Sequence, residues 1–282
     1  MDKRRLEENL FKGLMLVSTF IVLGSLAAVL VVVIIRGAPA LSVQMLTQTP
    51  KGGYYLGREG GILNAIVGSL YLAGGATVLA YVISLPTALY LNEYARKTRF
   101  ASLIRRSLDV LWSVPSIVYG AFGFTVMIYL GMRASLLGGI VALTLLELPI
   151  MIRAMDEVIG MIPEKMKEAS YALGSTKLET TLNATIRQAF PGILTAVLLA
   201  FGRAIGDAAS VLFTAGYTDY VPTSLFDPAA SLPLALFFQL GTPFPEVQQR
   251  AYASGVVLLA IVLTISIVSR IQAKKFMKYV IR

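Results

Sequence analysis

The 282-residue sequence contains no cysteine and no histidine. Disulfides, metal sites built on thiolates or imidazoles, and catalytic triads that depend on histidine are therefore excluded. The sequence also lacks paired carboxylate motifs on facing apolar segments, which disfavours catalysis within a membrane. We therefore expect a chain with no catalytic residues, no metal site and no cofactor of its own.

Acidic residues are also scarce, with 16 Asp and Glu against 25 Lys and Arg, which gives a net charge of +9. The chain is 56% hydrophobic and its mean hydropathy is +0.72. Several apolar runs approach the roughly 20 residues that a helix needs to cross a bilayer. These features predict an all-α polytopic membrane protein. Because the basic residues lie beside the apolar runs, we expect them to contact membrane lipid and not nucleic acid.

Six apolar segments are expected to cross the membrane as helices, and the connections 36–61 and 216–251 are expected to be external. The predicted spans cover about 14–35, 62–91, 108–130, 136–152, 191–215 and 253–268. The chain then divides into three parts. These are an amino-terminal tail, first span and external loop at 1–60, a membrane domain at 61–271, and a basic tail at 272–282.

The distribution of basic residues predicts the topology. An even number of spans places both termini on one side, and the two terminal segments with the loops 92–107 and 153–190 hold 19 of the 25 Lys and Arg. Positive residues stay on the cytoplasmic side, so both termini and the loop 153–190 are predicted to be cytoplasmic. A prokaryotic plasma membrane is the expected location.

The stretch from Glu168 to Ala215 joins a polar half to an apolar half. The polar half has short apolar patches at helical spacing, which predicts two amphipathic helices broken near Gly174 that could insert into a cleft on a partner. The apolar half follows Pro191. Because a proline at the first helical turn loses no needed N–H, Pro191 is interpreted as a helix start.

Arg203 is a charged residue within the fifth predicted span. It lies 12 residues beyond Pro191, which is about 18 Å along a helix and close to the middle of a ~30 Å membrane core. Arg203 and Asp207 are four residues apart, so one helical face could carry both. They either neutralise each other inside the bundle or contact a passing anion. Gly202 and Gly206 form a G-x-x-x-G pair that favours close helix packing, and a gating contact is the alternative.

Residues of the polar half resemble the EAA loop of ABC-importer permeases, with Ser170 and Phe190 as mild departures. The matching positions are Glu168, Ala169, Gly174, Ile186 and Pro191. Three further motifs, YLNEYA (90–95), PSIVYG (115–120) and GRAIGDAASVLFTAG (202–216), resemble the phosphate ABC-importer permease family, nearer its PstA-like branch. The resemblance covers nearly all of 61–271. Asp207 stands where the family pattern has Glu.

This resemblance implies a type I ABC-importer permease fold and a transmembrane subunit of an ATP-driven inorganic phosphate importer. It implies a second, PstC-like permease, two copies of a PstB-like cytoplasmic ATPase and an external PstS-like phosphate-binding protein. The EAA coupling loop would cover about 163–191 and dock on the ATPase, while Arg203 and Asp207 would act in substrate translocation. Since the sequence has no G-x-x-x-x-G-K-[ST] loop, ATP and Mg would bind to the ATPase chains.

An ion-coupled secondary transporter of a small anion is the alternative function. In that case Asp207 and Glu147 would bind the coupling ion. The alternative predicts inverted sequence repeats, and none is evident. A purely structural membrane subunit is a third possibility, but it does not explain an arginine in the middle of a span.

Overall fold

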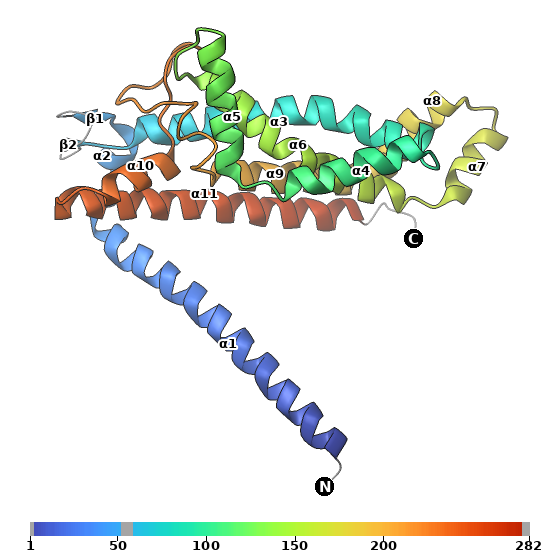
Figure 1. The fold of residues 1–282 in the computed structure, drawn as a ribbon, viewed down its shortest axis with the longest axis horizontal. Coiled ribbons are helices and arrows are strands. Elements are labelled where there is room, and N and C mark those ends of the chain that lie inside the picture. Colours follow the sequence, from blue (N-terminus) through green and yellow to red (C-terminus); the bar gives the residue numbers. More distant parts are fainter. Residues whose placement is uncertain (1–2, 52–58, 278–282) are drawn as a thin grey trace.

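A computed structural model describes residues 3–51 and 59–277, and nearly all regular structure in this part of the chain is helical (Figure 1). The long helices are α1 (Lys3–Gly37), α3 (Leu63–Leu89), α4 (Arg99–Trp112), α5 (Ser116–Tyr129), α6 (Leu136–Gly160), α9 (Ile186–Ile205) and α11 (Pro245–Met277). The short ones are η1 (Ala38–Ala40), α2 (Val43–Thr47), α7 (Glu164–Ala172), α8 (Lys177–Thr180), α10 (Leu232–Leu240) and two π-helical turns, η2 (Tyr90–Tyr94) and η3 (Thr181–Thr185). Strands β1 (Pro50–Lys51) and β2 (Glu59–Gly60) pair antiparallel.

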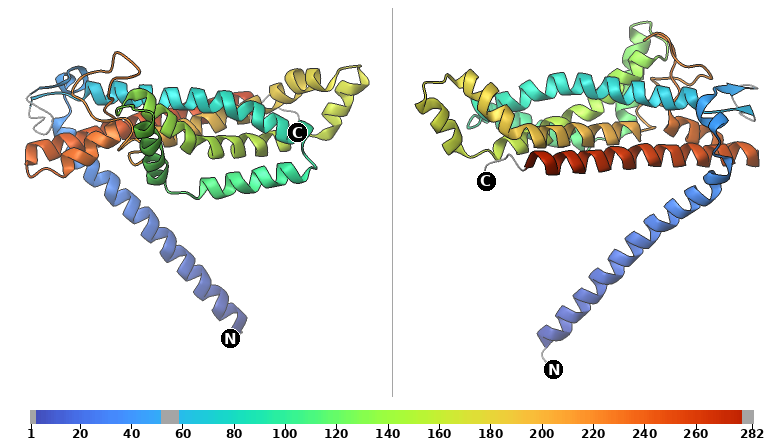
Figure 2. Two further views of the ribbon diagram at one scale, coloured as in Figure 1. Left: turned by 45° about the horizontal axis from the view of Figure 1, so that its top comes forward. Right: turned by 180° about the vertical axis from the view of Figure 1, so that it is seen from behind.

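The helices α3, α6, α9 and α11 form a bundle along the long axis of the molecule (Figures 1 and 2). Helices α7 and α8 lie at one end of it, and α2, α10 and the strands lie at the other. Helix α1 leaves the bundle beside α11 and projects away from it. Its apolar side chains from Leu10 to Ile35 are exposed along most of its length, so lipid or another chain must cover them.

Small residues allow α3 and α6 to pack closely. Ala76 and Ala80 of α3 are fully buried, and a Cβ atom on Gly75 would come within 2.7 Å of the Ile140 side chain. Lipid tails are as apolar as the side chains, so helix association in a membrane depends on such close packing. A larger residue at Gly75 would push the two helices apart.

Five helical segments of the described chain are long and apolar enough to cross a membrane, and the bent α4–α5 pair would make a sixth if it acts as one span. The five are Glu7–Ala40, Leu63–Tyr94, Leu136–Gly160, Lys177–Ile205 and Pro245–Gln272. The polytopic helical architecture is therefore confirmed. The helices extend beyond the predicted spans because their polar ends stay helical although they carry no hydropathy signal.

The third predicted span, 108–130, is wrong as one continuous helix. Helix α4 ends at Trp112, α5 begins at Ser116, and the two axes differ by 98°. Pro115 between them has extended backbone angles, φ −58° and ψ 139°. The proline ring disfavours a helical conformation in the residue before it, which ends α4 there. Across the bend the Tyr119 hydroxyl donates to the Leu111 carbonyl at 2.8 Å, which fixes the angle between the helices.

The interpretation of Pro191 as a helix start is also wrong. It lies inside α9, and α8, η3 and α9 run without a break from Lys177 to Ile205. Pro191 and its neighbour Ile193 are buried, and Ile193 belongs to the apolar cluster between α6 and α9. This packing keeps the helix continuous although the proline removes one helical hydrogen bond. The helix then ends at Ile205, about ten residues before the predicted end of the span. The predicted depth of Arg203 is counted from Pro191, so it no longer follows from the start of the helix.

The apolar segment SLPLALFFQL, within the connection 216–251 that was predicted to be external, forms α10. Its apolar residues Leu232, Leu234 and Ala235 are buried, and the helix packs on α3 and α11. The backbone N–H of Leu232 donates to the Ser69 hydroxyl of α3 at 2.8 Å. The protein itself therefore covers this apolar segment.

Asp156 of α6 is the centre of a polar network at the end of the bundle that carries α7. Its side chain is only 6% exposed. Arg105 of α4 contacts both carboxylate oxygens, at 2.8 and 2.9 Å, and the Asn92 amide of η2 donates to Oδ1 at 2.6 Å. Arg153 adds a contact at 3.3 Å. One carboxylate thus ties α4, α6 and η2 together.

We expect the Asp156→Ala variant to lose about 2 kcal/mol of stability, because it leaves the donors of Arg105 and Asn92 without their buried acceptor. Thermal unfolding of the purified protein in detergent measures this as a drop in Tm of roughly 5 °C. Asp109→Ala is the matched control, since Asp109 is 52% exposed and pairs with Arg153 at the surface, where about 1 kcal/mol or less is at stake. Equal shifts for both variants would contradict a central role for Asp156.

Candidate translocation and coupling site

Arg203 lies in the last turn of α9 and points away from the core of this chain. Ala200 and Ala204, on the adjoining face, are buried, whereas Arg203 and Leu199 are exposed. Within the described part of the chain, the Arg203 side chain has neither a hydrogen bond nor a salt bridge. The end of α9 lies beside the central part of α11 (Figures 1 and 2). The guanidinium can therefore contact a ligand or another chain outside this subunit.

Asp207 does not share a helical face with Arg203, so that part of the sequence interpretation is wrong. Gly206 caps the end of α9, and Asp207 follows it in the connecting segment. One of its oxygens, Oδ2, accepts from the backbone N–H of Ser210 at 2.8 Å and from the Ser210 hydroxyl. This contact caps the turn at 209–215. Mutual neutralisation of the two charges is also wrong, since no salt bridge within 4.0 Å joins them in the described structure.

The segment after Asp207 brings two of the sequence motifs together. A Cβ atom on Gly120, in PSIVYG, would lie 2.8 Å from the carbonyl oxygens of Ala209 and Ser210. The backbone N–H of Ser135 donates to the Thr214 carbonyl at 2.9 Å, so the start of α6 holds the other end of the segment. Irregular backbone inside a membrane protein must be satisfied by the protein, and these contacts do so.

Gly202 and Gly206 do not pack against another helix of this chain. A Cβ atom on Gly202 would have no neighbour within 4 Å, and one on Gly206 would meet only carbonyl oxygens of its own turn, at 3.7 Å or more. Both glycines flank Arg203 on the uncovered side of α9. Close approach of a helix from another chain remains a prediction for this pair.

The predicted break near Gly174 and the first short helix, α7, are confirmed. The second short helix is wrong as a separate element, because α8 continues through η3 into α9. Gly174 has φ +86°, a conformation that side chains with a Cβ rarely adopt. Thr176 and Glu179 form a capping box that starts α8. Glu168 and Ala169 are exposed, as are the large apolar side chains of Leu173 and Leu178. The loop thus presents an uncovered, partly apolar surface. Ile186 is half-buried in α9, close to Pro191.

A charged cleft of about 430 Å³ separates α7 from η2. Lys97, Lys167, Tyr171 and Lys177 are among the residues that line it, together with Glu93. Desolvation raises the pKa of the Tyr171 hydroxyl, and the nearby carboxylates raise it further. Lys167 and Glu93 form a buried ion pair that sequence reasoning missed, because the two residues are 74 positions apart.

Glu147 is fully buried between α3 and α6. The Thr77 hydroxyl donates to its Oε1 at 3.4 Å, and its Oε2 has no hydrogen-bond partner in the described structure. The Asp207 Oδ2 atom accepts from Ser210, and no hydrogen bond joins Asp207 to Glu147 in the described structure. No group of three or more carboxylates that could hold a metal ion lies among the described residues. The arrangement therefore gives no support to a coupling-ion site shared by Asp207 and Glu147.

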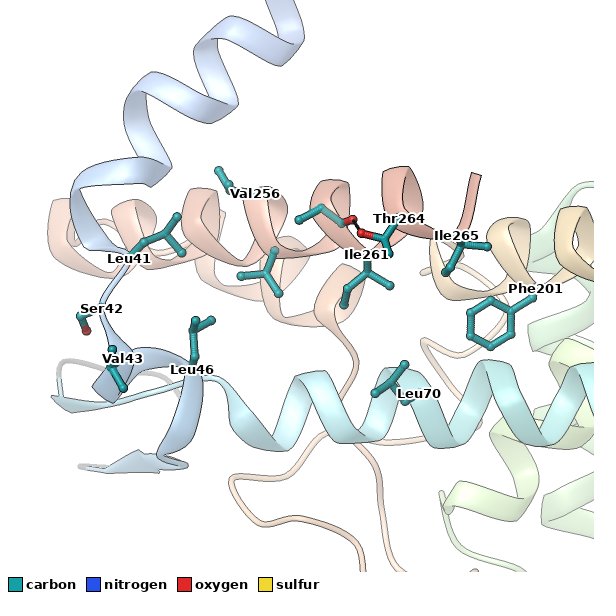
Figure 3. A pocket seen from close by; sticks show the side chains of 12 residues that line it. Leu41, Ser42, Val43, Leu46, Leu70, Phe201, Val256, Ile261, Thr264 and Ile265 are labelled. Atoms are coloured by element: carbon teal, nitrogen blue, oxygen red, sulfur yellow. Dashed lines mark hydrogen bonds between the residues drawn. The ribbon is translucent and has the colours of Figure 1, made fainter. Parts of the chain in front are cut away.

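The apolar cavity in Figure 3, of about 830 Å³, cannot serve as an anion path. It opens between α3 and α11 and is lined by side chains such as Leu70, Phe201 and Ile261, with the hydroxyls of Ser42 and Thr264 as its polar side-chain groups. An anion would lose its hydration there without gaining hydrogen bonds.

The fold defines the class of protein. It is similar to the inward-facing MetNI methionine ABC transporter, with a TM-score of 0.60 and 18% identity over 76% of this chain and 95% of that chain. A bacterial ABC transporter that imports the acidic polysaccharide alginate also matches, with a TM-score of 0.51 and 15% identity over 94% of this chain and 98% of that chain. The chain thus has the type I importer fold of an ABC-transporter membrane subunit.

Residues 80–278 match the family described as binding-protein-dependent transport system inner membrane component, and the chain belongs to this family. It is 34% identical to the phosphate transport system permease protein PstA of Haemophilus influenzae, over 95% of this chain and 94% of the relative. It is also 34% identical to PstA 1 of Mycobacterium tuberculosis (strain H37Rv), over 94% of this chain and 87% of the relative. The probable permease YqgI of Bacillus subtilis is 30% identical over 95% of both chains.

The family membership establishes the role of the chain within a transporter. It is a multi-pass membrane permease subunit, and it is not the catalytic component. A transporter of this class uses a separate ATPase chain and a substrate-binding protein. The ion-coupled alternative is not supported.

Proposed function

We propose that this chain is a transmembrane permease subunit of an ATP-driven importer of inorganic phosphate, and that it forms half of the translocation path. The relatives named as phosphate transport system permeases support the substrate. The single observation that carries the proposal is the exposed Arg203 guanidinium at the end of α9, which has no carboxylate partner in the described structure.

Arginine suits this role chemically. Its guanidinium is always charged and presents a planar set of N–H donors that match phosphate oxygens. A charge at the centre of a membrane costs roughly 2.5–3.5 kcal/mol on insertion scales, so it faces a polar path or a protein interior. Since Arg203 points away from its own core, such a path lies between this subunit and a second chain. Tight capture of the anion is left to the external binding protein.

Asp207 is proposed to select among anions at the same place. Ser210 holds its Oδ2, and no hydrogen bond to Oδ1 is present in the described structure. That oxygen can accept a hydrogen bond from a protonated phosphate, whereas it would repel a fully deprotonated oxyanion such as sulfate.

The proposed assembly places a PstC-like permease against the uncovered side of α9, where Gly202 and Gly206 allow close approach. Two copies of a PstB-like ATPase, which bind ATP and Mg, lie beneath α7 and α8. A PstS-like phosphate-binding protein delivers substrate to the external face. Both termini are cytoplasmic in a prokaryotic plasma membrane, membrane lipid surrounds the bundle, and 61–271 is the transport domain between the amino-terminal region 1–60 and the tail 272–282.

The coupling surface consists of α7, α8 and the turn between them. Leu173 and Leu178 are exposed there and offer an apolar face to the ATPase. Glu168, Ala169 and Gly174 form the part of the EAA loop that docks, and Ile186 and Pro191 connect it to the membrane part of α9.

We expect Arg203→Gln to lower phosphate uptake by the reconstituted four-component transporter at least tenfold, because it removes charge-assisted hydrogen bonds worth about 1.5–3 kcal/mol. Uptake of labelled phosphate into proteoliposomes at fixed ATP measures the effect. Arg106→Gln, which removes an exposed cation of α4, is the matched control and should leave uptake unchanged. Full phosphate uptake by Arg203→Gln would contradict the proposal.

The Asp207→Asn variant should retain phosphate uptake and admit more sulfate.

Gly174→Asp is expected to abolish ATP-driven uptake while the subunit remains in the membrane. A residue with a Cβ is strained at φ +86°, and the added charge lies in the turn that should meet the ATPase. Quantitative blotting of membranes checks that the subunit remains in the membrane, and co-purification of the ATPase checks whether the coupling contact is lost. Normal uptake together with normal ATPase binding would argue against α7 and α8 as the coupling surface.

A further inference from the structure

The ion pair between Lys167 and Glu93 is unusual for its burial. The Lys167 Nζ atom of α7 lies 2.6 Å from the Glu93 Oε1 atom of η2, and the two side chains are 6% and 3% exposed. Lysine and glutamate are almost never this buried unless they are paired. Lys167 is also the only buried residue of α7. The helix that is proposed to meet the ATPase is therefore attached to the bundle largely through a charge.

The same carboxylate receives a contact from a third segment. The Thr185 hydroxyl of η3 donates to Glu93 Oε1 at 3.4 Å. At the edge of the site, Glu164 lies 3.8 Å from Lys167 Nζ and pairs with Arg96 at 3.0 Å. Glu93 thus joins α7 to the ends of two membrane helices, since η2 continues α3 and η3 leads directly into α9.

Both of these junctions are π-helical. The turns η2 and η3 are the π-helical segments of the described chain, and the contact from Thr185 to Glu93 joins them. A π-helical turn is a local departure from α-helical hydrogen bonding that is rare in general and frequent at functional sites. The ion pair therefore sits where the hydrogen bonding of the helices that continue into α3 and α9 departs from the α-helical pattern.

We propose that Lys167 and Glu93 are positioning residues for energy coupling, and that their ion pair transmits displacement of α7 into α3 and α9. This inference rests on the proposed function, because it assumes that an ATPase moves α7. A buried ion pair is costly to break, because removing one partner leaves an uncompensated buried charge. Displacement of α7 therefore moves η2 and η3 with it, and η3 leads through α9 to Arg203.

The experiment measures phosphate uptake per ATP hydrolysed by the complete transporter in proteoliposomes. We expect Lys167→Met to lower this ratio at least fivefold while the complex still assembles and hydrolyses ATP. Exchange of the two charges, in a variant carrying both Lys167→Glu and Glu93→Lys, should restore a large part of the ratio. Lys12→Met is the matched control, because Lys12 forms an exposed ion pair with Glu8 on α1, outside the coupling surface, and it should leave the ratio unchanged.

A milder variant keeps the test decisive if Lys167→Met prevents assembly. Glu93→Asp keeps both charges and shortens one side chain, so the complex should assemble with a lowered ratio. A wild-type ratio in whichever of these two variants assembles would show that the ion pair is only a structural contact, and would overturn the inference.

The wild-type complex separates this inference from the proposed function. If it imports no phosphate, the proposed substrate is wrong, and coupling is then measured as the stimulation of ATP hydrolysis by the external binding protein. Loss of that stimulation in Lys167→Met or Glu93→Asp would support the coupling role whatever the substrate. Unchanged stimulation in the variant would refute it.

Discussion

The structure depends on the pairing of charged side chains in a low-dielectric environment. Small residues bring the apolar helices of the bundle close together, so nearly every charged side chain within it needs a partner that offers an opposite charge or a hydrogen bond. Asp156 has Arg105, and Lys167 has Glu93. Glu147, which is fully buried, and Arg203 have no such charged partner among the described residues. Of these two, Arg203 lies on an uncovered helical face, which we propose is covered by a second chain.

The two ends of α9 connect this incomplete site to the coupling surface. Its amino-terminal end continues from α8 and η3, beside the ion pair that holds α7. Its carboxyl-terminal end carries Arg203 and stops at Gly206, where the chain turns into the segment that Asp207 caps. A single continuous helix from Lys177 to Ile205 can therefore relate the position of the coupling loop to the position of the guanidinium. That geometry fits a membrane subunit in which transport and ATP hydrolysis occur on different chains.

Much of the fold could be predicted from the sequence, because long apolar runs and basic flanking residues have one simple solution in a membrane. The helix break at Gly174 was also predictable, because glycine and the spacing of the neighbouring apolar residues are local signals. Hydropathy did not reveal the bend at Pro115, since both sides of it are apolar. The sequence suggested a helix start at Pro191. The helix is in fact continuous there because Ile193 packs against α6, and that packing leaves no local signal in the sequence. The spacing of Arg203 and Asp207 suggested one helical face, and Gly206 ends the helix between them. The pair of Glu93 and Lys167 depends on contacts 74 residues apart, which no periodicity records.

The exposure of Arg203 to an aqueous path in the assembled transporter tests this account most directly. The chain has no cysteine, so Arg203→Cys and Ala204→Cys each introduce a single thiol, on the uncovered and the buried face of α9. Labelling with a charged thiol reagent requires water and a thiolate. The account predicts that position 203 reacts in the complete complex, that phosphate slows the reaction, and that position 204 stays unreactive. An unreactive thiol at 203, with an exposed Arg4→Cys reacting normally in permeabilised membranes, would contradict it.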